Sequence, residues 1–324
     1  MRFSFVVAIL ARLNLFVGAS MLAPMVCALA YGEGSWRAFA LAMVATISVC
    51  SILSATFLMP KEEITHREGM MIVTLGWLTA SLFGALPFAL SEMLGPVSFD
   101  SVAGCIFESV SGFTTTGASV LGTAVPIESL GRGLLLWRSM THWMGGMGII
   151  VLAIAILPLL GVGGMQLFRS EAPGPTKEKL RPRIRETAAT LWMVYVTLTA
   201  VQVFLLMLGG MDLFDAVCHS FATMATGGFS TRDASVGAFN SAYIDYVIIL
   251  FMFAAGANFS LHYHAFSGKL SGYFRSGEFR AYAAITVLAT LAVGAFLTAD
   301  SFYHGPLETL RKAAFQVVSV ITTT

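Results

Sequence analysis

Seven stretches of this 324-residue chain contain no Asp, Glu, Lys or Arg and are long enough to cross a lipid bilayer. A transmembrane helix needs about 17–25 predominantly apolar residues. Apolar residues fill all sides of these stretches, without the 3.6-residue stripe of a soluble amphipathic helix. The pattern therefore predicts an all-α polytopic membrane protein. The stretches are residues 13–32, 38–60, 69–91, 139–168, 187–211, 246–268 and 281–299.

The composition excludes several classes of protein. Only 11% of the residues are charged, whereas a soluble globular domain has about 25%. A net charge of +1 argues against nucleic-acid binding. The four cysteines have no C-x-x-C or Cys/His metal spacing, so we interpret them as buried thiols. A soluble enzyme, a nucleic-acid-binding protein and a disulfide scaffold are all excluded.

The basic residues predict an orientation, because cytoplasmic connections carry an excess of Lys and Arg. If the N-terminus is cytoplasmic, 13 of the 19 basic residues lie on the cytoplasmic side. The connection 161–186, which contains Arg181, Arg183 and Arg185, is the strongest single signal. We therefore expect a cytoplasmic N-terminus. The six basic residues left outside are Arg37, Arg132, Arg138, Arg232, Arg311 and Lys312.

In two segments between the spans, residues 99–118 and 213–230, the apolar helical part runs into Thr and Gly and is too short to cross the bilayer. Each begins with a Phe-Asp pair, so Asp100 and Asp215 are the expected N-caps. A third short helix is expected to start at Pro306, since proline suits the first helical turn. Non-helical backbone at membrane depth is tolerated only in protein or beside a water-filled cavity. We therefore expect three short helices that dip into the membrane around such a cavity.

The three short helices end in similar sequences. Aligned on Thr116, Thr226 and Thr324, each is an apolar helix that runs into Thr and, in the first two, Gly. The spacings of 110 and 98 residues indicate an internal repeat. The candidate ion-lining residues are Thr114, Thr115, Thr116, Gly117, Ala225, Thr226, Gly227, Gly228, Thr322, Thr323 and Thr324.

These residue types suit a dehydrated alkali cation. Thr supplies a carbonyl and a hydroxyl oxygen without net charge, and a ring of such oxygens can replace a hydration shell. The C-terminal end of a helix is partly negative, which favours a cation. We expect Gly117 and Gly227 to adopt the positive φ that only Gly takes freely. A single Thr-Thr-Thr-Gly is more often an ordinary turn, but three similar segments at one topological position favour the filter.

At these segments the sequence resembles the Trk/Ktr/HKT potassium-transporter superfamily, and within it the bacterial TrkH/TrkG type of membrane subunit. The matching stretches cover essentially the whole chain. They are SGFTTTGAS at 111–119, HWMGGMGIIVLA at 142–153, LPLLGVGGMQL at 157–167, ATGGFSTRDAS at 225–235 and GANFSLH at 256–262.

The resemblance implies helix–pore loop–helix repeats around a pseudo-fourfold pore. It divides the chain into two N-terminal helices (1–60), repeat one (69–168, pore loop 99–118), repeat two (187–268, pore loop 213–230) and the start of repeat three (278–324). Relative to the family, the chain stops inside the third filter segment. We therefore expect a truncated sequence that cannot enclose a four-sided pore alone.

The resemblance also implies a function: potassium uptake across a bacterial inner membrane, with K⁺ as the transported ion and no organic cofactor. The implied partners are a cytoplasmic RCK-type (TrkA-like) nucleotide-binding subunit, a second copy of the chain and membrane lipid, but no nucleic acid. The basic loop 169–185 is expected to face lipid headgroups, with docking of the cytoplasmic partner as the alternative. The sequence leaves open whether the pore prefers K⁺ or Na⁺. The alternatives are a non-conducting membrane scaffold and an intramembrane enzyme, for which the spans lack a catalytic constellation.

Four polar residues lie within or beside the predicted membrane segments. Glu108 is interpreted as a structural acid bonded to nearby filter backbone, with a functional role as the alternative. His219 is expected to be a hydrogen-bonding residue of its helix. His262 is expected to snorkel from a cytoplasmic helix end. Asn258 is expected to bond the pore-loop backbone or another helix.

Overall fold

The computed structural model describes residues 2–57, 65–94, 101–122, 125–156, 180–266, 268, 270–299 and 305–324. Throughout these ranges the regular structure is helical, with no strand. The predicted all-α fold is therefore confirmed for the described part of the chain. The chain divides into two compact units, Met1–Glu186 and Thr187–Thr324.

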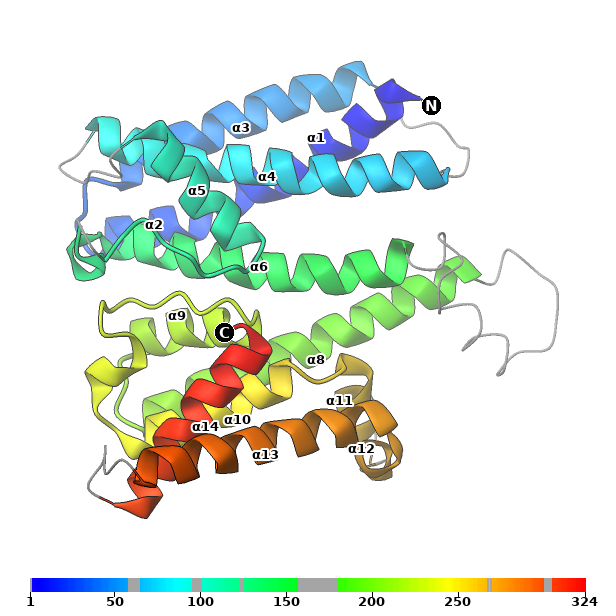
Figure 1. Cartoon of the computed structure of the whole chain (residues 1–324). Helices are drawn as coiled ribbons and strands as arrows, with labels where there is room; N and C mark the ends of the chain where they lie inside the picture. The colour runs from blue at the N-terminus through cyan, green and yellow to red at the C-terminus, as the bar shows by residue number, and fades with distance from the viewer. Residues whose placement is uncertain are drawn as a thin grey trace. The chain divides into compact units, whose positions relative to one another are not determined.

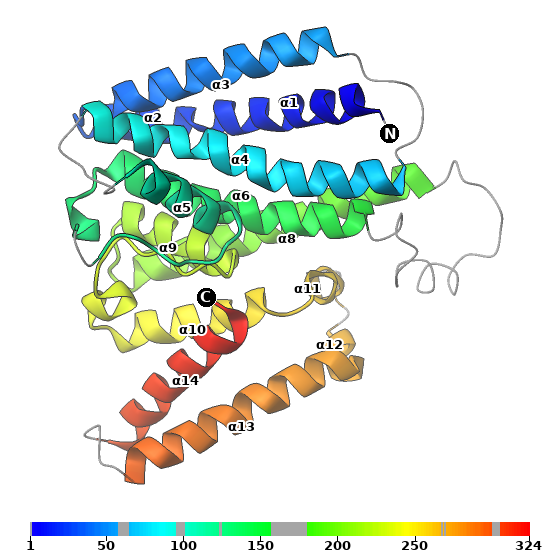
Figure 2. The same ribbon diagram turned by 45° about the horizontal axis from the view of Figure 1, so that its top comes forward.

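The first unit is built mainly of long helices, and α5 is the first of the three helices expected to dip into the membrane. Helices α1, α3 and α4 pack against one another, and the short α5 contacts both α4 and α6 (Figure 1 and Figure 2). The bounds are α1 (Phe3–Ser20), α2 (Leu22–Ala30), α3 (Trp36–Thr56), α4 (His66–Leu94), α5 (Val102–Phe113), η1 (Ile127–Ser129) and α6 (Arg132–Ile156).

Aromatic and small residues hold α5 in place. The fully buried Trp137 of α6 donates its indole N–H to the carbonyl of Gly84 in α4, at 2.9 Å. The ring of Trp137 also meets the ring of Phe113, the last residue of α5, edge-on. Ser109 donates its hydroxyl to the carbonyl of Ser81 at 2.7 Å. Because Gly84 has no side chain, α5 can lie directly against α4.

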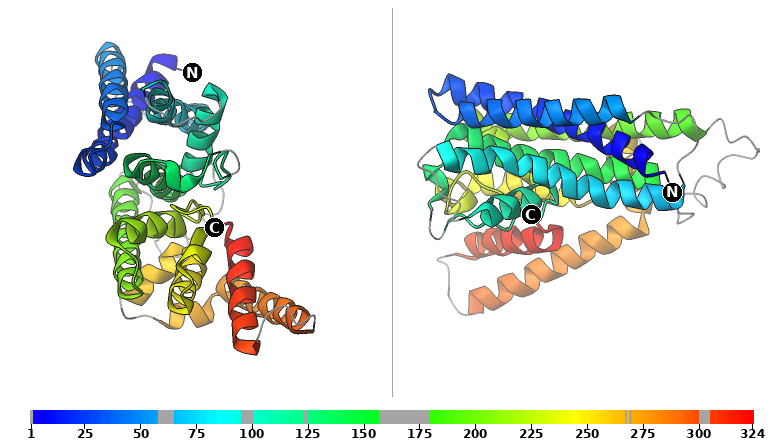
Figure 3. Two further views of the ribbon diagram at one scale, coloured as in Figure 1. Left: turned by 90° about the vertical axis from the view of Figure 1, so that its left-hand side faces the viewer. Right: turned by 90° about the horizontal axis from the view of Figure 1, so that it is seen from above.

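The second unit contains the other two helices expected to dip into the membrane, α9 and α14. Helix α9 packs against α10, and α14 packs against both α10 and α13 (orange and red for α13 and α14 in Figure 3). The bounds are α8 (Leu180–Leu208, which starts before the unit boundary), α9 (Leu213–Met224), η3 (Ser235–Phe239), α10 (Ala242–Ala255), α11 (Phe259–Phe266), α12 (Ser271–Arg275), α13 (Gly277–Ala299) and α14 (Pro306–Thr322).

Five of the predicted spans coincide with helices long and apolar enough to cross a membrane. A sixth coincides with α10 and α11, which are bent by 104° at a short break. The seventh, 139–168, starts within α6, and its part beyond residue 156 lies outside the described residues, as does most of the loop 169–185. Large apolar side chains on the outer faces, such as Leu288 at 67% exposed, fit a lipid environment.

The helix starts correct one expectation. Asp215 was predicted to be an N-cap, but the cap of α9 is Asp212, whose carboxylate accepts the N–H of Asp215 at 2.9 Å. Asp212 has the extended backbone that a cap requires, so the helix begins earlier than expected. Asp100 lies outside the described residues, and Ser101 caps α5. The predicted start of α14 at Pro306 is confirmed.

Candidate functional site

The three short helices end in the same backbone geometry. Thr115, Thr226 and Thr323 have φ values of 54°, 54° and 60°. A β-branched residue rarely adopts a positive φ. Three threonines in this conformation therefore indicate that the three helix ends require the same backbone turn.

Each helix end also has the same two hydrogen bonds, in the pattern of the Schellman motif. The amide of the positive-φ threonine donates to the carbonyl three residues before it, and the next amide donates to the carbonyl five residues before it. The pairs are Thr115–Gly112 and Thr116–Ser111, Thr226–Thr223 and Gly227–Ala222, Thr323–Val320 and Thr324–Ser319, with N···O distances of 2.9–3.3 Å.

This geometry corrects the alignment of the three ends. The equivalent threonines are Thr115, Thr226 and Thr323, not those matched by taking the last Thr of each segment. Positive φ is found at Gly117 (75°) and at Gly228 (80°), so the expectation for Gly227 was wrong. The second segment has two glycines after Thr226. The position of the helix end determines which of them adopts the positive φ.

The side chains of the three ends differ. In the first and third, two threonine hydroxyls bridge across the positive-φ residue. The second end has Ala225 and Gly227 at these positions, so Thr226 is its only threonine. Among the described residues, no group of three or more His, Cys, Asp or Glu side chains is placed to hold a metal ion. The bridged pairs are Thr114–Thr116 at 2.7 Å and Thr322–Thr324 at 2.8 Å.

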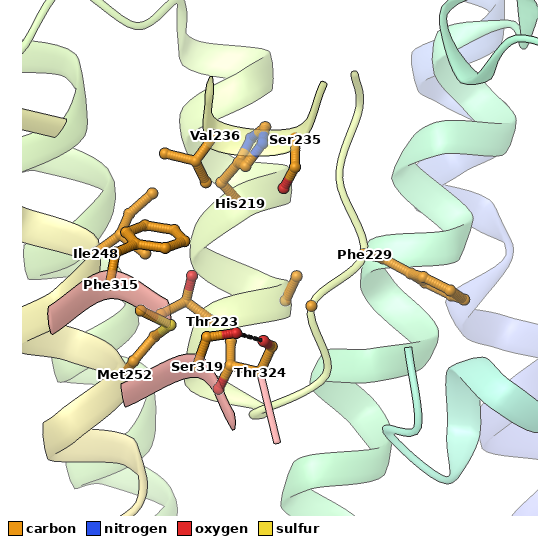
Figure 4. A pocket seen from close by; sticks show the side chains of 12 residues that line it. His219, Thr223, Phe229, Ser235, Val236, Ile248, Met252, Phe315, Ser319 and Thr324 are labelled. Atoms are coloured by element: carbon orange, nitrogen blue, oxygen red, sulfur yellow. Dashed lines mark hydrogen bonds between the residues drawn. The ribbon is translucent and has the colours of Figure 1, made fainter. Parts of the chain in front are cut away.

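The second and third ends meet within the second unit. A Cβ built on Gly228 would lie 2.7 Å from the carbonyl carbon of Thr324. A cavity of about 80 Å³ lies beside this contact, between α9, α10 and α14 (Figure 4). Its polar lining residues are His219, Thr223, Ser235, Ser319 and Thr324. Residues 114–117 belong to the first unit.

A buried ion pair supports the first end. Glu108 of α5 is 0% exposed, and its carboxylate accepts from Arg138 Nε of α6 at 2.7 Å. The same carboxylate accepts from the Ser119 hydroxyl at 3.0 and 3.1 Å and from the Val120 amide at 3.2 Å. Glu108 therefore binds the segment just after Gly117, which agrees with its interpretation as a structural acid.

The second end has a different polar cluster. His219 Nδ1 lies 2.8 Å from the carbonyl of Asp215, and His219 Nε2 lies 3.1 Å from the Ser230 hydroxyl. The Asp215 carboxylate accepts from Thr231 Oγ1 at 2.8 Å and from Arg232 Nη2 at 2.9 Å. The hydrogen-bonding interpretation of His219 agrees with this arrangement. Ser119 and Ser230 were not among the predicted site residues, although each lies two residues after the positive-φ glycine of its segment, Gly117 or Gly228.

Two other interpretations are corrected. His262 was expected to snorkel, but it is buried between the Tyr273 hydroxyl at 2.6 Å and the Ala254 carbonyl at 2.9 Å. Asn258 was expected to reach the pore-loop backbone or another helix. Its side-chain oxygen instead accepts from the amide and hydroxyl of Ser260, at 3.0 and 2.8 Å. Both side chains serve the ends of α10 and α11, whose free backbone groups need partners.

Comparison with known proteins gives a consistent result. Residues 36–297 match the family model TrkH, described as a cation transport protein. The Trk system potassium uptake protein TrkH of Escherichia coli K12 is 44% identical over 325 residues, which covers 100% of this chain and 66% of that protein. TrkG of the same organism is 40% identical over 253 residues, covering 77% of this chain and 50% of TrkG.

A solved structure is also similar. The crystal structure of the potassium transporter TrkH from Vibrio parahaemolyticus matches with a TM-score of 0.88 and 36% identity. The match covers 99% of this chain and 64% of that one. This chain thus spans slightly less than two thirds of the length of the curated TrkH relative from Escherichia coli.

Proposed function

Because this chain belongs to the TrkH family of cation transport proteins, we propose that the protein takes up potassium ions across a bacterial inner membrane. The curated relatives carry the name of potassium uptake proteins, which supports transport over an intramembrane enzyme or a non-conducting scaffold. The membrane setting is supported by five long apolar helices in the described part of the chain.

The ions pass a filter lined by neutral oxygens. The observation that carries this proposal is the identical helix end at Thr115, Thr226 and Thr323, each with a positive-φ residue and a Schellman pattern. Carbonyl and hydroxyl oxygens at such an end can replace the hydration shell of K⁺. The proposed filter residues are Thr114, Thr115, Thr116, Gly117, Ala225, Thr226, Gly227, Gly228, Thr322, Thr323 and Thr324.

The filter segments belong to a series of helix–pore loop–helix repeats. Residues 1–60 are two preceding spans, the first formed by α1 with α2 and the second by α3. Residues 69–168, 187–268 and 278–324 are the first, second and partial third repeats. The short helices α5, α9 and α14 serve as pore helices, with their partly negative C-terminal ends toward the ion.

The cytoplasmic side carries the N-terminus and the contacts with partners. The name of the Trk system supports a multi-component assembly. We assign it a cytoplasmic RCK-type (TrkA-like) nucleotide-binding subunit and a second copy of this chain. The excess of Lys and Arg in the cytoplasmic connections supports the orientation.

Rubidium uptake tests the filter. The full-length protein should restore Rb⁺ uptake to a bacterial strain that lacks potassium uptake, and K⁺ should compete better than Na⁺. Gly117→Ser and Gly228→Ser should each reduce the discrimination between K⁺ and Na⁺ by roughly tenfold, since a Cβ strains a positive φ by about 1–2 kcal/mol. Gly227→Ser is the comparison for backbone strain, because Gly227 has no positive φ and the equivalent residues, Thr116 and Thr324, carry side chains; it should reduce the discrimination less than Gly228→Ser does. Equal effects at Gly227 and Gly228 would contradict the alignment.

Cysteine labelling tests the orientation. The four native cysteines are free thiols and are first replaced by alanine. A cysteine at the exposed Ala234 should react with an impermeant thiol reagent added outside the cell. A cysteine at the exposed Ser271 should react only after the membrane is opened. The reverse pattern would show that the N-terminus faces outward.

A further inference from the structure

The corrected alignment places Glu108 and His219 at the same position. Each lies seven residues before the positive-φ threonine of its segment, Thr115 or Thr226. Each also bonds a serine that lies two residues after the positive-φ glycine, Ser119 for Glu108 and Ser230 for His219. A carboxylate and an imidazole thus contact the same structural element in two segments that differ in sequence.

The serines also have matching backbone contacts. The hydroxyl oxygen of Ser119 accepts the amide of Leu121 at 3.1 Å, and that of Ser230 accepts the amide of Arg232 at 3.0 Å. Each serine therefore closes a local turn and has its own proton left to donate. In both segments the donated proton is directed at the short helix.

The imidazole is suited to accept that proton. A carbonyl oxygen can only accept, so the contact of His219 Nδ1 with the Asp215 carbonyl requires an N–H at Nδ1. In the neutral ring, Nε2 then carries the lone pair and accepts from Ser230. Neutral His219 and ionised Glu108 are therefore chemically different side chains with one role, that of acceptor.

We propose that Glu108 and His219 are positioning residues of the ion filter, each holding the far end of its segment through Ser119 or Ser230. The Schellman bonds fix the start of each segment at the helix end. The serine bridge fixes its finish beyond Gly117 or Gly228. With both ends attached to one rigid helix, the oxygens between them keep the spacing that separates K⁺ from Na⁺. This inference depends on the proposed transport function.

Removal of each serine hydroxyl tests the proposal in the full-length protein with its partners, by Rb⁺ uptake with competing K⁺ or Na⁺. Ser119→Ala and Ser230→Ala should each lower discrimination against Na⁺ roughly 3- to 10-fold, the range that one ordinary hydrogen bond represents. The structure offers matched controls, because the buried hydroxyls of Ser111 and Ser220 have no hydrogen-bond partner among the described residues. Ser111→Ala and Ser220→Ala should leave discrimination within about twofold of the wild type.

Variants of His219 separate positioning from folding. His219→Gln keeps an acceptor and should retain most of the discrimination, whereas His219→Leu should lose it as Ser230→Ala does. The amount of each variant in the membrane is measured in parallel, and discrimination is a ratio that does not depend on that amount. If the bridge variants discriminate as well as the controls, the inference is wrong. If the wild type restores no Rb⁺ uptake, the proposed function itself is wrong.

Discussion

Helices α6 and α10 follow the first and second filter segments, and they begin at nearly equivalent positions, Arg132 and Ala242, but end differently. With Thr115 aligned to Thr226, Gly145 of α6 corresponds to Gly256 at the end of α10. Helix α6 continues past this position to Ile156. Helix α10 stops at Ala255, and the chain turns by 104° into α11.

This difference indicates that the break in the second helix is determined by capping groups and not by glycines. The continuous helix has the sequence Gly-Gly-Met-Gly at 145–148, whereas the broken one has only one glycine, in Gly-Ala-Asn-Phe at 256–259. The second helix has Asn258 to cap α11 and His262 to bind the Ala254 carbonyl. These polar groups supply partners for the helix ends that the break leaves free.

The polar contacts of the two short helices differ as well. The pair between Glu108 and Arg138 is completely buried, with side chains 0% and 1% exposed. The pair between Asp215 and Arg232 is open on one side, since the Arg232 side chain is 44% exposed. Loss of one partner of a buried pair leaves an unpaired charge in the protein, whereas water can replace an exposed partner.

The largest expected effect comes from the two arginines. Arg138→Met should lower the free energy of unfolding by about 3–5 kcal/mol, because Glu108 would be left as an unpaired buried charge. Arg232→Met should cost at most about 1 kcal/mol. Thermal unfolding of the purified protein in detergent measures both. The double variant Glu108→Gln with Arg138→Met should recover part of the loss, and equal losses for the two single variants would remove the distinction between the pairs.

An intermediate effect is expected at the equivalent glycines. A Cβ on Gly145 would collide with the carbonyl of Phe113, which is backbone at the end of α5 and cannot move alone. A Cβ on Gly256 would meet the ends of the Tyr282 and Thr322 side chains, which can shift. Gly145→Ala should therefore cost about 1–3 kcal/mol and Gly256→Ala less, in the same unfolding measurement.

Gly277→Ala is the control for these two substitutions, since nothing lies within 4 Å of its Cβ position. It should be neutral in the unfolding measurement. A larger loss at Gly256 than at Gly145 would show that the break is the more tightly packed site.

The smallest expected effect concerns the break itself. Asn258→Met places at the break the residue that α6 has at the equivalent position, Met147. The substitution should lower the free energy of unfolding by about 1 kcal/mol, the contribution of an N-cap. It should also speed hydrogen exchange of the Ser260 amide. Unchanged exchange would mean that Asn258 does not hold the break.

The sequence by itself determined the class of protein and the candidate residues. Long uncharged stretches predict a helical membrane protein. In lipid, a helix is one of the few structures in which the backbone N–H and C=O groups are all hydrogen-bonded within the protein. The three Thr-rich ends could be found by self-comparison, and the start of α14 at Pro306 followed from the fixed φ of proline. These signals are local, so they are readable in the order of the residues.

Tertiary structure alone decided the alignment and the partners. Whether Gly227 or Gly228 adopts the positive φ depends on where α9 ends, and the hydrogen bonds of the Thr226 and Gly227 amides close that end within the packed helix. Arg138 lies 30 residues from Glu108 along the chain, so no local pattern joins them. A hydrogen bond depends on distances of a few ångströms in space. Linear sequence does not record such distances, and they exist only after the helices have packed.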